Sequence, residues 1–208
     1  MATAPQKKFY TVEEYLELEM RSDVKHEFYR GEIFQMTGAS RAHNLIRTSI
    51  TVAVGSHLRG KPCELYDGDM RVRIGNSGLY VYPDVAIACP PIEVEQVQGL
   101  DTLLNPAVVI EVLSPSTEGF DRGDKLGFYQ QLPSVKEYLL VSQNEPRIDH
   151  LIRTDPNQWK LMMHLGIDQT VRIETIDYVL PLKVVYDRIE FHSVQAPEGQ
   201  GMIREMRH

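Results

Sequence analysis

The stretch AVVIEVLSPST, residues 107–117, decides the fold of this chain. Its continuous run of Val and Ile is typical of a β-strand buried on both faces, and Ser114-Pro115-Ser116 ends it. A single acid, Glu111, lies inside the run. An ionised carboxylate buried in such a strand is destabilising unless it meets a cation, a metal or dedicated hydrogen-bond donors. The sequence therefore predicts a partner for Glu111.

Length and composition predict a single soluble domain. The 208 residues suit one domain over residues 1–192, with a core at about 10–150 and a strand-rich extension at 146–192, followed by a flexible tail at 193–208. The 22 basic and 29 acidic residues give a formal charge of −7, which is mildly unfavourable for binding a phosphate backbone. No apolar run is long enough for a membrane span or a signal peptide, so we expect a cytoplasmic protein.

The first third of the chain predicts helices and a hairpin. Thr11 and Glu14 form a capping-box pattern before a short helix at 12–20, with Leu18 as one of its inward-facing candidates. The segment 26–38 reads as a hairpin around Arg30-Gly31. Ser40 is an N-cap candidate for a helix that ends near Gly60. Helical spacing predicts that one stripe faces a sheet: Ala42, Leu45, Ile46, Ser49, Val52 and Ala53.

The rest of the chain predicts a sheet with one crossover helix. Strand-like runs cover 63–74 and 79–89, and Pro83 inside the second marks a bulge or an edge. Residues 90–106 show no clean period and are expected to form a connecting loop. After the central strand, a helix from about Asp121 should stop before Pro133, and strands should follow at 137–145 and, antiparallel, up to 185. The fold class is therefore α/β with a mixed sheet.

The two cysteines, Cys63 and Cys89, lie in apolar, strand-like segments. They lack C-x-x-C spacing, so the pattern favours reduced, buried thiols over a disulfide or a zinc site.

Two acids and a lysine stand out as candidate site residues. Asp84 follows Pro83 and leads into the apolar run VAIA, so it could converge with Glu111 if the two strands are neighbours. Two convergent carboxylates with water suit Mg²⁺ or Mn²⁺, which prefer oxygen ligands. Lys125 shares a helical stripe with Phe128 and Tyr129, so it is expected to point toward the sheet and the end of the central strand.

Several segments of the sequence resemble those of a known family. The segments YPDVAIA, IEVLSPST and DRGDKLGFYQQLPSVKEYLLV, with HEFYRGEI upstream, are similar to a bacterial family of restriction-endonuclease-like proteins that is abundant in cyanobacteria. That family belongs to the PD-(D/E)xK nuclease superfamily, and the resemblance covers roughly residues 10–150. Pro83-Asp84 matches the PD element and Glu111 the (D/E) position. Leu113 stands where the superfamily lysine normally lies, and the family's relocated lysine maps onto Lys125.

The resemblance implies a restriction-endonuclease-like core and a metal-dependent endonuclease site. Asp84, Glu111 and the backbone carbonyl of Val112 would bind one or two Mg²⁺ or Mn²⁺ ions, with DNA as the substrate. Lys125 would orient the attacking water or stabilise charge on the phosphate. Glu27 matches an acid near the start of the family pattern, and His43 could approach the same pocket.

Each of these residues also has a structural interpretation. Asp84 could be a turn residue that bonds nearby backbone, and Glu111 could form a buried ion pair with Lys125. Lys125 could instead pair with Asp121 at i, i+4 on a solvated face. Glu27 could be an exposed edge charge, and a histidine such as His43 more often packs than reacts.

Two functions of different classes follow. The leading hypothesis is a DNA endonuclease; the alternative is a non-catalytic nucleic-acid-binding or assembly protein that keeps the nuclease fold. The acidic balance and the displaced lysine motivate the alternative. Motifs of zinc hydrolases, nucleotide-binding loops and serine hydrolases are absent from the sequence. Exposed edge strands in the C-terminal third suggest a homodimer.

Overall fold

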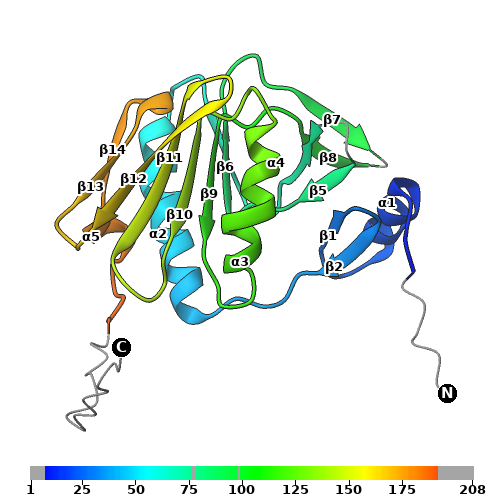
Figure 1. Ribbon diagram of the computed structural model, residues 1–208, viewed down its shortest axis with the longest axis horizontal. Helices are drawn as coiled ribbons and strands as arrows, with labels where there is room; N and C mark the ends of the chain where they lie inside the picture. The colour runs from blue at the N-terminus through cyan, green and yellow to red at the C-terminus, as the bar shows by residue number, and fades with distance from the viewer. Residues whose placement is uncertain (1–7, 76–77, 98, 192–208) are drawn as a thin grey trace, which may run out of the picture.

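The computed structural model describes residues 8–75, 78–97 and 99–191, and the fold is built around a six-stranded mixed sheet (Figure 1). The predicted central strand is β9 (Val108–Val112), which pairs in parallel with β10 (Glu137–Val141) and antiparallel with β6 (Val85–Ala88). Every residue of these three strands is buried. The sheet continues on either side through β11 (Arg147–Asp155), β12 (Gln158–Leu165) and β3 (Glu64–Asp67).

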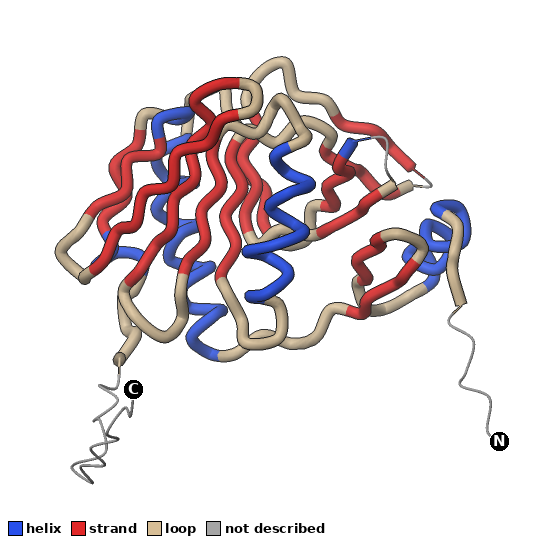
Figure 2. The backbone as a smooth tube through the Cα atoms, in the orientation of Figure 1, coloured by secondary structure: helices blue, strands red, loops and turns tan. Residues whose placement is uncertain are grey.

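Helices cover both faces of this sheet, as Figure 2 shows. The helix α2 (Arg41–Leu58) packs on one face, together with a small β13 (Thr170–Ile173)–β14 (Tyr178–Pro181) hairpin and α5 (Leu182–Val185). The other face carries a helical segment of three parts: α3 (Glu118–Phe120), a π-helical turn (Asp121–Lys125) and α4 (Leu126–Gln130). The strand β9 therefore sends alternate side chains into two separate apolar cores.

The predicted N-cap of α2 is confirmed, but its buried stripe differs from the prediction. Ser40 accepts the backbone N–H of His43. The stripe consists of His43, Ile46, Ile50, Val54 and Leu58, whereas Val52 is 62% exposed. The true stripe follows 3.6-residue spacing through Ile50, and the predicted one was rotated because small residues were counted as apolar.

A second six-stranded sheet forms the N-terminal side of the molecule. In spatial order it contains β2 (Glu32–Gln35), β1 (His26–Tyr29), β5 (Leu79–Val81), β4 (Arg71–Ile74), β8 (Leu100–Leu103) and β7 (Val94–Val97). The predicted hairpin is β1–β2, and α1 (Val12–Arg21) begins with the predicted Thr11 capping box, although Leu18 is exposed. The expectation that 90–106 is a loop is wrong: it contains the β7–β8 hairpin, whose largely exposed strands show no apolar period.

The chain passes between the two sheets five times, and two of these passages split a predicted strand. The run 63–74 becomes β3 in one sheet and β4 in the other, with the turn at Asp67-Gly68. The run 79–89 becomes β5 and β6, joined through Pro83. Pro83 therefore marks neither a bulge nor an edge. It lies where the chain leaves one sheet for the other, directly before Asp84.

The prediction of reduced thiols is wrong, because Cys63 and Cys89 form a disulfide. The antiparallel register of β3 and β6 pairs Glu64 with Ala88, so the cysteines are the next opposite pair. Only the tertiary pairing of two strands brings them together, which sequence spacing does not show.

The C-terminal third is strand-rich, as predicted. The long hairpin β11–β12 adds two antiparallel strands to the main sheet. The predicted flexible tail lies outside the described residues. Among the residues described, no helix is long and apolar enough to cross a membrane.

Candidate active site

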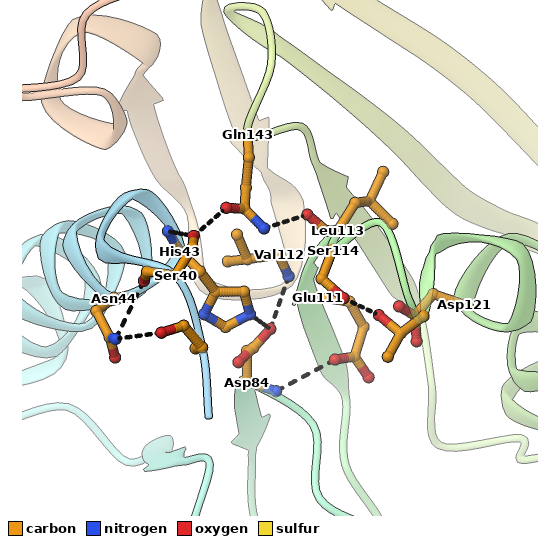
Figure 3. A network of polar contacts seen from close by, with 12 residues as sticks. Ser40, His43, Asn44, Asp84, Glu111, Val112, Leu113, Ser114, Asp121 and Gln143 are labelled. Carbon is orange, nitrogen blue, oxygen red and sulfur yellow. Dashed lines mark hydrogen bonds and ion pairs between the residues drawn. The ribbon is translucent and has the colours of Figure 1, made fainter. Parts of the chain in front are cut away.

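The two predicted acids lie side by side at one end of neighbouring strands. Asp84 immediately precedes β6 and Glu111 lies in β9, and the strand register places them opposite one another. The backbone N–H of Asp84 donates to Glu111 Oε2 at 3.3 Å, and the N–H of Val112 donates to Asp84 Oδ2 at 2.8 Å (Figure 3). The Asp84 carboxylate thus accepts a backbone donor of β9 where the ladder between the strands ends.

The predicted partner of Glu111 is Lys125. Its Nζ lies 2.8 Å from Glu111 Oε1, and both side chains are about 95% buried. Lys125 ends the π-helical turn that follows β9, so the chain leaves the strand, turns at residues 114–117 and returns its lysine over the strand end. The alternative of a solvated i, i+4 pair is wrong, because Lys125 is 4% exposed.

Two further acids contact the ammonium group of Lys125. Asp121, which begins the same π-helical turn, lies 3.4 Å from Nζ, and Glu27 of β1 lies at the same distance. Glu27 also accepts the backbone N–H of Tyr82 at 3.2 Å. A π-helical turn is often found at functional sites, and here it holds Asp121 and Lys125 on one buried side. The interpretation of Glu27 as an exposed edge charge is therefore wrong, since its side chain is 17% exposed.

His43 approaches the acids from the start of α2. Its Nε2 lies 3.2 Å from Asp84 Oδ2, and its buried Nδ1 has no hydrogen-bond partner. Sequence reasoning did not find Gln143, which follows β10. Gln143 accepts from Ser40 Oγ at 2.5 Å and donates to the carbonyl of Leu113 at 2.6 Å. This amide ties the N-terminus of α2 to the end of β9 and so fixes His43 relative to Asp84 (Figure 3).

The charges in this cluster do not balance. Burial, together with the nearby Asp121 and Asp84 charges, raises the pKa of Glu111 well above its ordinary value, although Lys125 opposes the shift. Burial alone would lower the pKa of Lys125, but Glu111, Glu27 and Asp121 raise it well above its usual range. Lys125 is therefore a stable cation, and the negative charge around it exceeds what one lysine neutralises.

The donors present fit a hard divalent cation. Asp84 and Glu111 offer adjacent carboxylate oxygens, and the excess negative charge is what such an ion would neutralise. Among the described residues no group of three His, Cys, Asp or Glu side chains is placed to hold a metal. An ion here would therefore take only two carboxylates from the protein, with the remaining ligands from backbone oxygen, water or substrate. Val112 contributes its N–H to the cluster, as described above.

Comparisons with known proteins identify the family of the chain. The family described as "Putative restriction endonuclease" (Uma2) matches residues 12–182, which include every residue of the cluster. The chain belongs to this family. Leu113 is 4% exposed within an apolar core, and the cation beside Glu111 is Lys125.

Relatives and a solved structure extend the match over most of the chain. The uncharacterized protein slr1290 of Synechocystis sp. is 34% identical over 179 residues, covering 86% of this chain and 92% of that protein. The uncharacterized protein sll1609 of the same organism is 37% identical over 160 residues, covering 76% and 89%. The crystal structure of a putative nuclease belonging to DUF820 from Anabaena variabilis superposes with a TM-score of 0.68. It covers 85% of this chain and 97% of that one at 18% identity, which establishes the fold alone. The restriction-endonuclease-like fold class is thereby confirmed.

Proposed function

We propose that this protein is a metal-dependent endonuclease that hydrolyses phosphodiester bonds, with DNA as its substrate and Mg²⁺ or Mn²⁺ as its cofactor. One observation carries the proposal. Asp84 and Glu111 meet at the end of two buried strands, and Lys125 lies 2.8 Å from Glu111 although Leu113 occupies the usual lysine position. Two carboxylates can bind a divalent ion that activates water, and a cation beside them can stabilise charge that develops on a phosphate.

Each residue has a role that follows from its contacts. Asp84 and Glu111, with the carbonyl of Val112, would hold the metal, which would supply Lewis-acid polarisation of a phosphate and activation of a water. Lys125 stays protonated among its acids, so it acts as a fixed positive charge that orients the nucleophile or stabilises the phosphate in the transition state. Glu27 and Asp121 hold the ammonium group in place.

His43 faces the other side of the acid pair. Its Nε2 contacts Asp84, so it orients this carboxylate. Gln143 positions the helix that carries His43.

Nicking of supercoiled plasmid tests the proposal, first with Mg²⁺ and then with Mn²⁺. We expect activity in the wild type and a loss of about 10²-fold or more in Glu111→Gln and Asp84→Asn, the scale seen when a transition-state charge interaction is removed. Glu137→Gln is the matched control, because Glu137 is a buried acid on the neighbouring strand outside the cluster. Equal activity in all variants would contradict the site assignment. Metal titration of the same proteins should show binding that Asp84→Asn and Glu111→Gln weaken.

The alternative function is a non-catalytic nucleic-acid-binding or assembly protein. It is favoured by one observation: the Lys125 ammonium is already surrounded by three carboxylates, as in a purely structural ion-pair network. This alternative predicts no nicking with either metal and no specific metal binding that depends on Glu111.

We also propose a homodimer in the cytoplasm, where DNA is accessible. The Cys63–Cys89 disulfide argues against the second part, because disulfides persist mainly in oxidising compartments. Counting free thiols in protein released from cells under alkylating conditions tests the location: two alkylated cysteines per chain would support the cytoplasm, and none would contradict it.

A further inference from the structure

The strand β12 is an unusually long and unprotected sheet edge. It spans eight residues at one end of the main sheet, whereas β3, β2 and β7 at the other three edges of the two six-stranded sheets span four each (Figure 1). Edge strands are normally blunted by short length, charge or proline, since they otherwise invite pairing. β12 carries apolar side chains instead: Leu161, Met163 and Leu165 are 55%, 58% and 55% exposed.

The alternation of hydrogen bonds between β11 and β12 shows which backbone groups of β12 have no partner in β11. The N–H of Gly166 donates to the carbonyl of Pro146, and the register pairs Ile148 with His164 as the next bonded pair. Bonded pairs alternate along an antiparallel ladder, so the even-numbered residues of β12 bond to β11. The N–H and C=O groups of Leu161, Met163 and Leu165 therefore point outward, and among the described residues no backbone bond satisfies them.

The same three residues share one face. Met163 lies opposite Asp149 of β11 and Leu161 opposite Leu151, so this row lies on the side of the sheet that α4 covers. The β13–β14 hairpin packs on the other side, with its apolar residues in the core that contains α2. Leu161, Met163 and Leu165 are more than half exposed, so no element of the described residues covers this row, which lies beside the outward-pointing backbone groups.

The row is self-complementary about Met163. In a two-fold antiparallel pairing centred there, Met163 faces the partner's Met163, and Leu161 faces the partner's Leu165. Trp159 would face the partner's Ile167, which extends the apolar ladder at both ends. On the opposite face, Lys160 would face the partner's Gly166, so no like charges meet.

We propose that β12 is a homodimer interface, in which two copies of this chain join their main sheets into one continuous twelve-stranded sheet about a two-fold axis through Met163. The interface would combine backbone hydrogen bonds between the outward groups with burial of the six exposed apolar side chains. The occupant is a second copy because this register pairs apolar with apolar at every position of the row. The inference does not depend on nuclease activity.

Molar mass in solution and cross-linking test the interface. The wild type should have twice the 23.8 kDa chain mass, and Met163→Lys, which places like charges opposite one another on the axis, should have the monomer mass. Val179→Lys is the control, since Val179 is 46% exposed on β14, away from the edge. Met163→Cys should form an intersubunit disulfide, because both native cysteines are already paired, whereas Lys160→Cys on the opposite face should not.

A charge swap tests the register itself. The Leu161→Lys/Leu165→Lys and Leu161→Glu/Leu165→Glu variants should each be monomeric, and their mixture should form a heterodimer in which opposite charges meet. A monomeric wild type, a dimer that survives Met163→Lys, or a mixture that stays monomeric would overturn the proposal. These outcomes are read from mass alone, so a failure of the proposed nuclease activity would not affect them.

Discussion

Two buried glutamates on neighbouring strands of the same sheet have opposite electrostatic environments. Glu137 begins β10 and is 1% exposed; Glu111 lies in β9 and is 4% exposed. Glu137 accepts three good hydrogen bonds, from His150 Nε2 at 2.7 Å and from the backbone N–H groups of Thr175 at 2.7 Å and Glu174 at 3.2 Å. Although burial opposes the shift, these donors lower the pKa of Glu137.

Glu111 lacks such donors. It receives one long backbone hydrogen bond and shares Lys125 with Glu27 and Asp121, so its pKa is raised well above the ordinary value. A fully satisfied buried acid stabilises the fold, whereas an under-satisfied acid among like charges is typical of a functional site. Glu137 therefore attaches the β13–β14 connection to the sheet, whereas the environment of Glu111 supports the role proposed for it above.

The largest effect on the free energy of unfolding should come from removing the positive charge of Lys125, which Glu111 shares with two other acids. Lys125→Met leaves two buried carboxylates, Glu111 and Asp121, and the partly buried Glu27 without this positive partner, so we expect a loss of about 3–5 kcal/mol in the free energy of unfolding. Lys136→Met is the control: Lys136 is an exposed lysine outside the cluster, and its loss should cost less than about 0.5 kcal/mol. Urea unfolding provides both values.

A double variant tests whether Lys125 and Glu111 are energetically coupled. Adding Glu111→Gln to Lys125→Met removes one of the unpaired acids and should recover part of the lost stability, which gives a favourable coupling energy. Purely additive losses would show that Lys125 and Glu111 are not energetically coupled, and the cluster as described would then be wrong.

The second effect separates the two glutamates directly. Glu137→Gln replaces an acceptor of three hydrogen bonds, and we expect it to lower the free energy of unfolding by about 1–3 kcal/mol. Glu111→Gln should cost nothing or be stabilising, because Lys125 keeps two carboxylates and one source of repulsion is lost. Metal-free denaturation of both variants measures the difference. Equal destabilisation would contradict the comparison.

Much of this site was predictable because its signals are local. An acid inside the run VVIEV requires a partner, and helical spacing places Lys125 on the buried stripe, so Glu111 and Lys125 follow from the sequence. The Asp121 contact also follows from i, i+4 spacing, although its burial does not. Asp84 was predictable from its position before an apolar strand.

The remaining features depend on tertiary pairing, which local patterns do not show. Periodicity predicted strands on both sides of Pro83 but could not show that they belong to different sheets. The Cys63–Cys89 disulfide exists because two strands align, and the contact of Gln143 with Ser40 joins residues 103 positions apart. The β7–β8 hairpin was missed because half of its residues are exposed and its apolar residues do not alternate with polar ones.

The smallest predicted effect is the pH dependence of the free energy of unfolding. The contributions of Glu137 and Glu111 to this dependence have opposite signs. The folded pKa of Glu137 lies below its ordinary value of 4.5, so its stabilising contribution is present above pH 4.5 and is lost as the pH falls through the folded pKa. The folded pKa of Glu111 lies above 4.5, so its contribution falls as the pH rises from 4.5 through that pKa.

Urea unfolding from pH 3 to 8 in EDTA should show both signs. The deficit of Glu137→Gln relative to wild type should shrink as the pH falls below 4.5, since the wild-type carboxylate is then protonated too. Any gain of Glu111→Gln should instead grow as the pH rises from 4.5. If both differences changed in the same direction with pH, the two acids would share one kind of environment, and the distinction between scaffold and site would fail.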